Sequence, residues 1–181
     1  MLLGRSTECS FLLQKKLMKM EEKIMAIKLN LDNTHAYCFP TKIASGQSGH
    51  ILNIVLTADA DNGSIVTTSA DSYVSFDQYT EEAAPAGYEA KIVDKAADGN
   101  FYVQVVEPAD AILICEVINN PYGNYDSRFK DSKLFYNAQG DVVRGYCLSK
   151  FDIYELSEEG FDGTPEVGKT VTITGRKHVV A

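Results

Sequence analysis

Residues 163–170 are the first group whose types and spacing could support chemistry. They read Gly-Thr-Pro-Glu-Val-Gly-Lys-Thr, which matches the GxxxxGK[ST] pattern of phosphate-binding loops. That chemistry needs a buried strand before the loop and a helix after it, because amides at the start of the helix hold the phosphate. Here the acidic segment 158–162 precedes the loop and a β-branched run, 171–174, follows it. We therefore predict a Pro/Gly turn that leads into a strand, with Lys169 in solvent, and no nucleotide site.

The cysteines are the second group. No two of them form a CxxC pair, which excludes a zinc ribbon and a thioredoxin-type redox motif. Cys115 and Cys147 lie in apolar segments typical of strands, which predicts buried free thiols that pack as small hydrophobic side chains. A disulfide between these two stays open, because spacing along the chain does not establish the geometry that a disulfide needs.

His35 and Cys38 stand three residues apart and raise the question of nucleophilic or metal chemistry. A catalytic Cys–His pair needs an orienting third group, and a metal site needs further ligands. Neither is evident nearby, so we predict no catalytic residues, no metal site, no cofactor and no enzymatic activity. A small hydrolase is kept as an alternative, in which His35 or His50 would have to meet Cys38 or a carboxylate across the fold.

The acidic segment 59–63, Asp-Ala-Asp-Asn-Gly, resembles the start of a calcium-binding loop. An EF-hand loop needs glycine at its sixth position and glutamate at its twelfth, whereas here the glycine is fifth and the twelfth residue is Ala70. Asn62-Gly63 instead favours a tight turn. We predict a hairpin turn with two solvated carboxylates, between strands at 50–57 and 64–68.

Aromatic and basic residues gather between positions 119 and 155. Residues 119–132 form a long polar loop, and loops of this length inside a compact domain are often functional. Tyr and Arg are enriched at interface hot spots. The predicted partner-binding residues are Tyr122, Tyr125, Arg128 and Phe129. The tyrosines expected in strands, Tyr136, Tyr146 and Tyr154, are predicted to pack.

Overall composition excludes several functional classes. The chain has 181 residues, a net charge of −8, 45% hydrophobic residues and 23% charged residues, which is typical of a globular protein. A negative net charge argues against nucleic acid as a partner. No apolar run approaches the roughly 18 residues that cross a bilayer, so we predict no membrane partner.

The first 24 residues differ from the rest. All four methionines fall within the first 25 residues, and residues 1–24 carry a net charge of +2, which leaves −10 over residues 25–181. The apolar stretch at 11–13 is too short for a secretory signal. Residues 1–24 are interpreted as a leader or a misassigned start, with translation beginning at Met25. A short N-terminal helix or a disordered segment is the alternative.

From Met25 onward the chain is built of short β-branched runs separated by turns, without amphipathic helices between them. This predicts a single all-β domain over 25–181, a sandwich or barrel of about nine to eleven antiparallel strands. Further strands are expected at 72–79, 88–94, 100–107, 111–118, 133–136, 141–148, 151–156 and 169–174. The run at 169–174 is the last strand expected.

The final third has a cadence that resembles a known class of proteins. It consists of Leu-Phe-Tyr-Asn at 134–137, the segment 140–148, Phe-Asp-Ile-Tyr at 151–154, and the Gly/Pro turns at 163–168. Over about residues 130–174 the chain resembles structural proteins of tailed bacteriophages, the auxiliary or decoration proteins of the capsid. The resemblance implies an all-β domain that binds and stabilises the assembled shell.

We therefore expect a non-enzymatic virion protein, most of all a capsid-associated one, assembled in the cytoplasm of the host bacterium. The expected partners are the major capsid protein or other virion proteins, and copies of this chain in a homo-oligomer. Partner contacts are expected in the 119–132 loop and at hairpin tips. The alternative is a glycan- or ligand-binding β-domain of a tail or adhesion protein.

Overall fold

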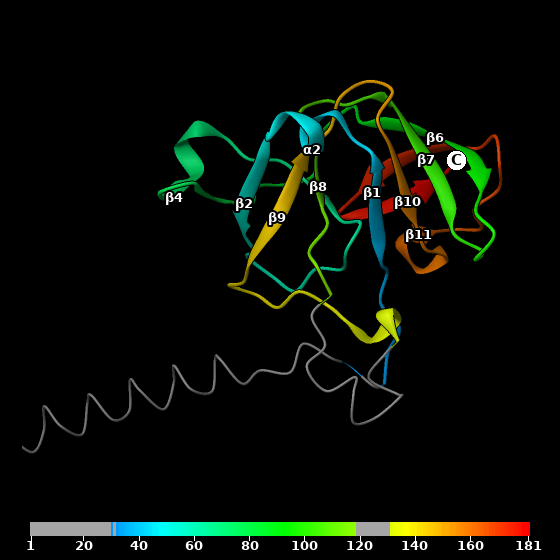
Figure 1. Cartoon of the computed structure of the whole chain (residues 1–181), viewed down its shortest axis with the longest axis horizontal. Coiled ribbons are helices and arrows are strands. Elements are labelled where there is room, and N and C mark those ends of the chain that lie inside the picture. The colour runs from blue at the N-terminus through cyan, green and yellow to red at the C-terminus, as the bar shows by residue number, and fades with distance from the viewer. Residues whose placement is uncertain (1–29, 31, 119–130) are drawn as a thin grey trace, which may run out of the picture.

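Two β-sheets make up the computed structural model, which describes residue 30 and residues 32–118 and 131–181 (Figure 1). The larger sheet has the strand order β1-β10-β7-β6-β12-β13-β11. Its strands are β1 (Cys38–Lys42), β6 (Glu89–Lys95), β7 (Phe101–Glu107), β10 (Ile153–Leu156), β11 (Phe161–Asp162), β12 (Thr170–Thr174) and β13 (Lys177–Val180).

The smaller sheet has the order β3-β8-β9-β2-β5-β4. Its strands are β2 (Ile51–Val55), β3 (Ile65–Val66), β4 (Tyr73–Ser75), β5 (Gln78–Thr80), β8 (Ile112–Ile114) and β9 (Val142–Cys147). The described helices are short: α2 (Ala44–Ser48), η1 (Ala70–Ser72), η3 (Ser132–Leu134) and η4 (Glu158–Gly160). Both sheets are open within the described residues, and all pairings are antiparallel except β2–β5 and β11–β13.

The main core cluster lies between the sheets and takes side chains from both. Alternation explains how β7 contributes to it, because Phe101, Val103 and Val105 are buried while the residues between them are partly exposed. Strand β8 is buried at all three positions, as expected for a strand covered on both faces. A second, smaller cluster packs around β2 and β9, with Ile54 and Val143 among its members.

The prediction of an all-β fold is confirmed. The described residues form thirteen strands, more than the nine to eleven expected, because several are only two or three residues long. The β6–β7 hairpin forms as predicted around Asp98-Gly99, where Gly99 has a φ of 98°. The phosphate-loop-like segment is a turn that leads into β12, with Lys169 exposed, as predicted.

Three expectations about local pairing are wrong. The segment 59–63 does not close a hairpin, because β3 pairs with β8 while β2 pairs with β9 and β5. The single strand expected at 72–79 is a hairpin of β4 and β5 that turns at Phe76-Asp77. β12 is not the last strand, since β13 follows it and also pairs in parallel with β11.

Residues 133–136 were expected as a strand, but the first two of them belong to η3. Asn137 instead forms an isolated bridge with Ala60. Residues 1–24, interpreted above as a leader or a misassigned start, lie outside the described residues. No helix in the described part of the chain is long and apolar enough to span a membrane.

Candidate functional site

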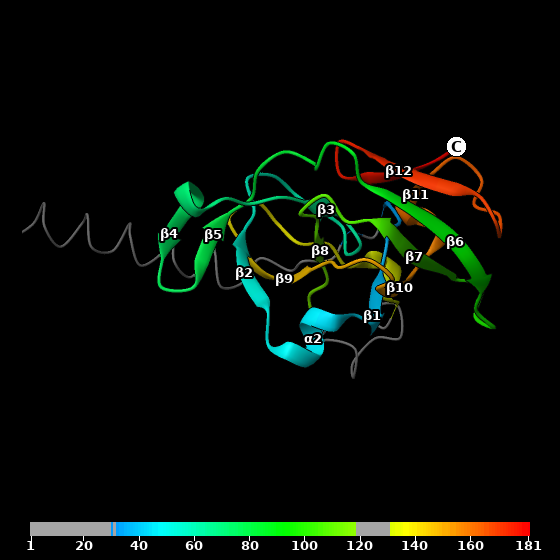
Figure 2. The ribbon, with the colours of Figure 1, turned by 90° about the horizontal axis from the view of Figure 1, so that it is seen from above.

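The β4–β5 hairpin carries the most exposed large apolar side chain of the described residues. Phe76 is 91% exposed, and Tyr73 and Val74, on β4 before it, are more than half exposed. β4 is one of the two edge strands of the smaller sheet. Figures 1 and 2 both show the hairpin at one end of the described fold, projecting away from the larger sheet.

Local interactions hold the hairpin in one conformation. Asp77 occupies the turn with a φ of 56°, a left-handed conformation that Asp tolerates better than most residues. Its carboxylate Oδ2 accepts a hydrogen bond from Asn53 Nδ2 of β2 at 2.8 Å. The rings of Tyr73 and Tyr79 pack edge to face with centroids 5.6 Å apart. Phe76 is therefore presented by a fixed turn.

The base of the hairpin is closed by a bridge between Thr67 and Glu82. Glu82 N donates to Thr67 O at 2.7 Å, and Ser69 with Ser72 forms a capping box at the start of η1. An aromatic side chain on a rigid projection resembles the anchors of protein interfaces, because little conformational entropy is lost when it docks. The hairpin is therefore the candidate contact surface among the described residues.

Other exposed apolar side chains are spread over several elements. They are Phe39 on β1, Val117, Val142 on β9, Phe151 and Val167. Phe151 lies in the turn before β10, is 69% exposed and has a φ of 74°. Only at β4 and its turn do three such residues fall within four consecutive positions among the described residues.

His35 meets a carboxylate across the fold, as the hydrolase alternative required. Its Nδ1 lies 2.7 Å from Asp61 Oδ1, and its ring stacks on Tyr136 with centroids 5.2 Å apart. Asp61 Oδ2 also accepts from the backbone amide of Ala36 at 3.3 Å. The expectation that both carboxylates of segment 59–63 are simply solvated is therefore wrong. His50 is exposed and has no hydrogen-bond or ion-pair partner among the described residues.

The described cysteines do not complete a nucleophilic site with His35. Cys38 is buried, and burial together with its neighbour Cys115 raises the pKa of its thiol well above the usual value. A neutral thiol is a poor nucleophile. Of the described cysteines, Cys38 and Cys115 are buried, Cys147 is half-buried, and all three are free thiols, so no disulfide joins Cys115 to Cys147.

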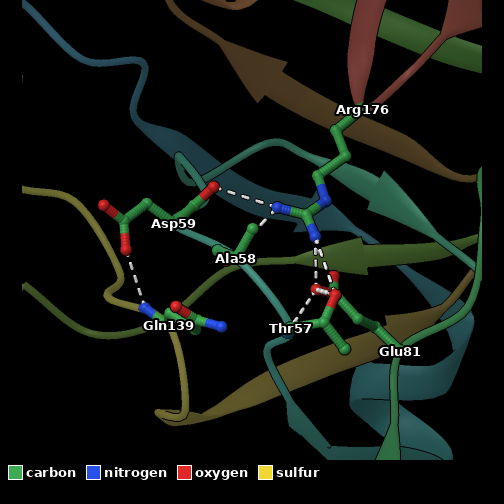
Figure 3. A network of polar contacts seen from close by, with 6 residues as sticks. All are labelled: Thr57, Ala58, Asp59, Glu81, Gln139 and Arg176. Carbon is green, nitrogen blue, oxygen red and sulfur yellow. Dashed lines mark hydrogen bonds and ion pairs between the residues drawn. The ribbon is translucent and has the colours of Figure 1, made fainter.

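A polar network around Arg176 connects the two sheets next to the loop that carries Asp59 (Figure 3). Arg176, in the β12–β13 turn, forms an ion pair with Glu81 just after β5, and Glu81 is almost completely buried. Arg176 Nη1 also donates to the carbonyl oxygens of Ala58 and Asp59, at 3.2 and 2.9 Å. Thr57 Oγ1 donates to Glu81 Oε1 at 2.7 Å. These contacts fix the loop that carries Asp59 and Asp61.

The predicted partner-binding residues, Tyr122, Tyr125, Arg128 and Phe129, lie outside the described residues, so their placement stays a prediction. Tyr146 and Tyr154 are buried, as predicted for packing. Tyr136 is half-buried beside His35. No cluster of three or more metal-ligating side chains is present in the part of the chain that the structure describes.

Sequence reasoning missed Phe76, because the alternating pattern of 72–79 reads as one half-buried strand. Asp77 was the available signal, since Asp favours turns and tolerates a positive φ. The spacing of His35 and Asp61 in the sequence gave no indication that the two side chains pair.

Comparison with family models, with curated proteins and with solved structures finds no match to this chain.

Proposed function

We propose that this protein is a non-enzymatic structural protein of a tailed-bacteriophage virion, a capsid-associated auxiliary or decoration protein that binds and stabilises the shell. The proposal rests on the resemblance of residues 130–174 to capsid auxiliary proteins and on the β4–β5 hairpin that projects from the smaller sheet. Its partners are the major capsid protein or other virion proteins, together with copies of this chain. It takes up its place in the virion as the particle assembles in the bacterial cytoplasm.

The observation that carries the proposal is the exposure of Phe76 at the tip of the β4–β5 hairpin. Complete burial of a Phe side chain contributes about 1.5–3 kcal/mol. One such contact is weak, but a capsid presents the same recess many times. A homo-oligomer that engages several recesses at once gains affinity by effective concentration, without any new type of contact.

The absence of catalysis and of a cofactor is part of the same proposal. The buried Cys38 thiol and the partnered His35–Asp61 pair give no nucleophile activated by a base among the described residues. Binding through surface burial needs neither.

Co-sedimentation of the full chain with purified tailed-phage heads tests the proposal. We expect the wild-type chain to pellet with heads and a Phe76→Ser variant to bind at least about tenfold more weakly, which corresponds to about 1.4 kcal/mol. Light scattering of the free chain should give the mass of a homo-oligomer.

Phe151→Ser is the matched control, because Phe151 is also an exposed phenylalanine in a turn but lies between β9 and β10, away from the hairpin. We expect it to bind like the wild type. A chain that stays in the supernatant with every head tested would overturn the proposal. Equal losses from the two variants would remove the hairpin from it.

A further inference from the structure

A polar cavity of about 500 Å³ lies beside the His35–Asp61 pair. Its volume is in the range of small-molecule sites, about 300–1,000 Å³. The described residues that line it are Asn30, Asn33, Thr34, His35, Asp59, Asp61, Tyr136 and Lys177. Neither the hairpin nor the Arg176–Glu81 ion pair lies in this lining.

Hydrogen bonds and ring stacking hold several side chains of the cavity lining in place. His35 is held from two sides, by the hydrogen bond to Asp61 and by stacking on Tyr136 at an interplanar angle of 27°. Asp59 is held by Gln139, whose backbone amide donates to Asp59 Oδ1 at 2.8 Å (Figure 3). Arg176 fixes the same loop through the Asp59 carbonyl. A site whose side chains are already positioned loses little entropy when a ligand binds.

The charges of the lining disfavour a metal ion and an anion. Both oxygens of Asp61 and one of Asp59 already accept hydrogen bonds, so few carboxylate oxygens are left for a metal ion. These two carboxylates would also repel an anion. Lys177 supplies one ammonium group, which has no hydrogen-bond or ion-pair partner among the described residues. Two carboxylates and one ammonium group leave the lining with one negative charge before His35 is counted.

The hydrogen-bonding groups suit a ligand that both donates and accepts. The lining offers amide groups on Asn30 and Asn33, a hydroxyl on Thr34 and the Lys177 ammonium, next to carboxylate acceptors. The Tyr136–His35 stack adds aromatic surface against which an apolar face can pack. Sugars combine these properties, since hydroxyls surround their rings and their C–H groups form an apolar face.

We propose that this cavity binds a neutral saccharide. The inference goes beyond the proposed function, because lattice binding through Phe76 does not use the cavity. A separate pocket of about 150 Å³ shares Asp59, Asp61 and Lys177 with the lining of this cavity. A capsid protein with such a site would display saccharide binding at the particle surface.

Saturation-transfer NMR on the full chain tests the site, with the methyl glycosides of glucose, galactose, mannose and N-acetylglucosamine as probes. We expect saturation transfer to at least one glycoside. Tyr136→Ala should weaken binding of that glycoside about tenfold, equivalent to about 1.4 kcal/mol. Asn33→Ala should weaken it as well, and because Asn33 is exposed this variant keeps the test valid if Tyr136→Ala does not fold.

Tyr73→Ala is the matched control, since it removes an exposed tyrosine from the hairpin and should leave saccharide binding unchanged. Sodium phosphate and sodium acetate are tested as competitors, and neither should displace the glycoside. Binding of phosphate without any glycoside, or no transfer to any glycoside, would overturn the saccharide site. The cavity variants leave the hairpin intact. Loss of saccharide binding can therefore be distinguished from loss of binding to phage heads.

Discussion

Tyr154 and His178 are joined by a hydrogen bond inside the main core, between the tyrosine hydroxyl and the imidazole Nε2. Tyr88 extends this row of hydrogen bonds, with its hydroxyl 2.9 Å from the hydroxyl of Tyr154. Both partners of the first bond are almost completely buried. The imidazole also packs against the Phe161 ring, with centroids 5.7 Å apart. The larger sheet thus closes its core around a neutral histidine.

This histidine should make stability depend on pH. Burial lowers the pKa of His178 from 6.5 to about 3, against a smaller opposing effect of the Gly160 hydrogen bond. Between these two pH values the unfolded chain binds a proton that the folded chain does not. The free energy of unfolding should therefore fall as pH drops below about 6.5, by up to about 1.4 kcal/mol per pH unit.

Urea unfolding between pH 7 and pH 5 measures this dependence, in a range where most carboxylates remain ionised. NMR of the imidazole resonances gives a direct check, since His178 should stay in its neutral form at pH 5. A His178 titration midpoint near 6.5 in the folded protein would contradict the prediction.

The ion pair of Arg176 with Glu81 predicts an asymmetric effect of mutation. Arg176→Met leaves the buried Glu81 carboxylate without its cation and should lower the free energy of unfolding by about 3 kcal/mol. The double variant Arg176→Met/Glu81→Gln should lose less, because no buried charge is left unpaired. Chemical denaturation measures both.

Lys177→Met is the control for this pair, as it removes the neighbouring exposed cation and should change stability by less than about 0.5 kcal/mol. Equal losses in the single and double variants would show that Glu81 does not need Arg176.

Gly145 in β9 is predicted to tolerate no side chain. A Cβ atom there would lie 2.6 Å from Ile112 Cγ2 and 2.7 Å from Ile54 Cγ1, inside the smaller core cluster. Gly145→Ala should therefore destabilise the protein by about 1–3 kcal/mol through overpacking.

The matched change is Gly46→Ala in α2, where the nearest atom to a new Cβ is Tyr146 Cε1 at 3.6 Å. This variant should be neutral or slightly stabilising, since Ala favours helix more than Gly does. Thermal unfolding compares the two variants. A Gly145→Ala melting temperature equal to the wild type would refute the close packing.

The thiols should differ in reactivity. Burial and the neighbouring Cys115 raise the pKa of Cys38, so Cys38 should resist alkylation by iodoacetamide in the folded protein. Cys147 is half-buried, and although burial also raises the pKa of its thiol, it should react first of the described cysteines. Peptide mass spectrometry of the alkylated protein reads the order, and rapid labelling of Cys38 would contradict it.

The sequence by itself determined the fold class and many of the strands. Alternation along 100–107 and the unbroken apolar run at 112–114 report burial directly, because side chains on a strand point to opposite faces. Asp98-Gly99 also specified its hairpin, since a tight turn depends on residues that tolerate a positive φ. These properties are local, so neighbouring residues suffice to encode them.

Tertiary structure alone decided which strands are neighbours and which side chains meet. Ile51–Val55 and Ile65–Val66 follow each other in sequence, yet β8 and β9 lie between them in the sheet. His35 meets Asp61 across 26 residues, and Glu81 meets Arg176 across 95. Such contacts depend on how whole sheet faces fit together around the core, and local periodicity carries no information about that fit. The same reason explains why Phe76, in a segment that reads as a half-buried strand, ends at an exposed tip.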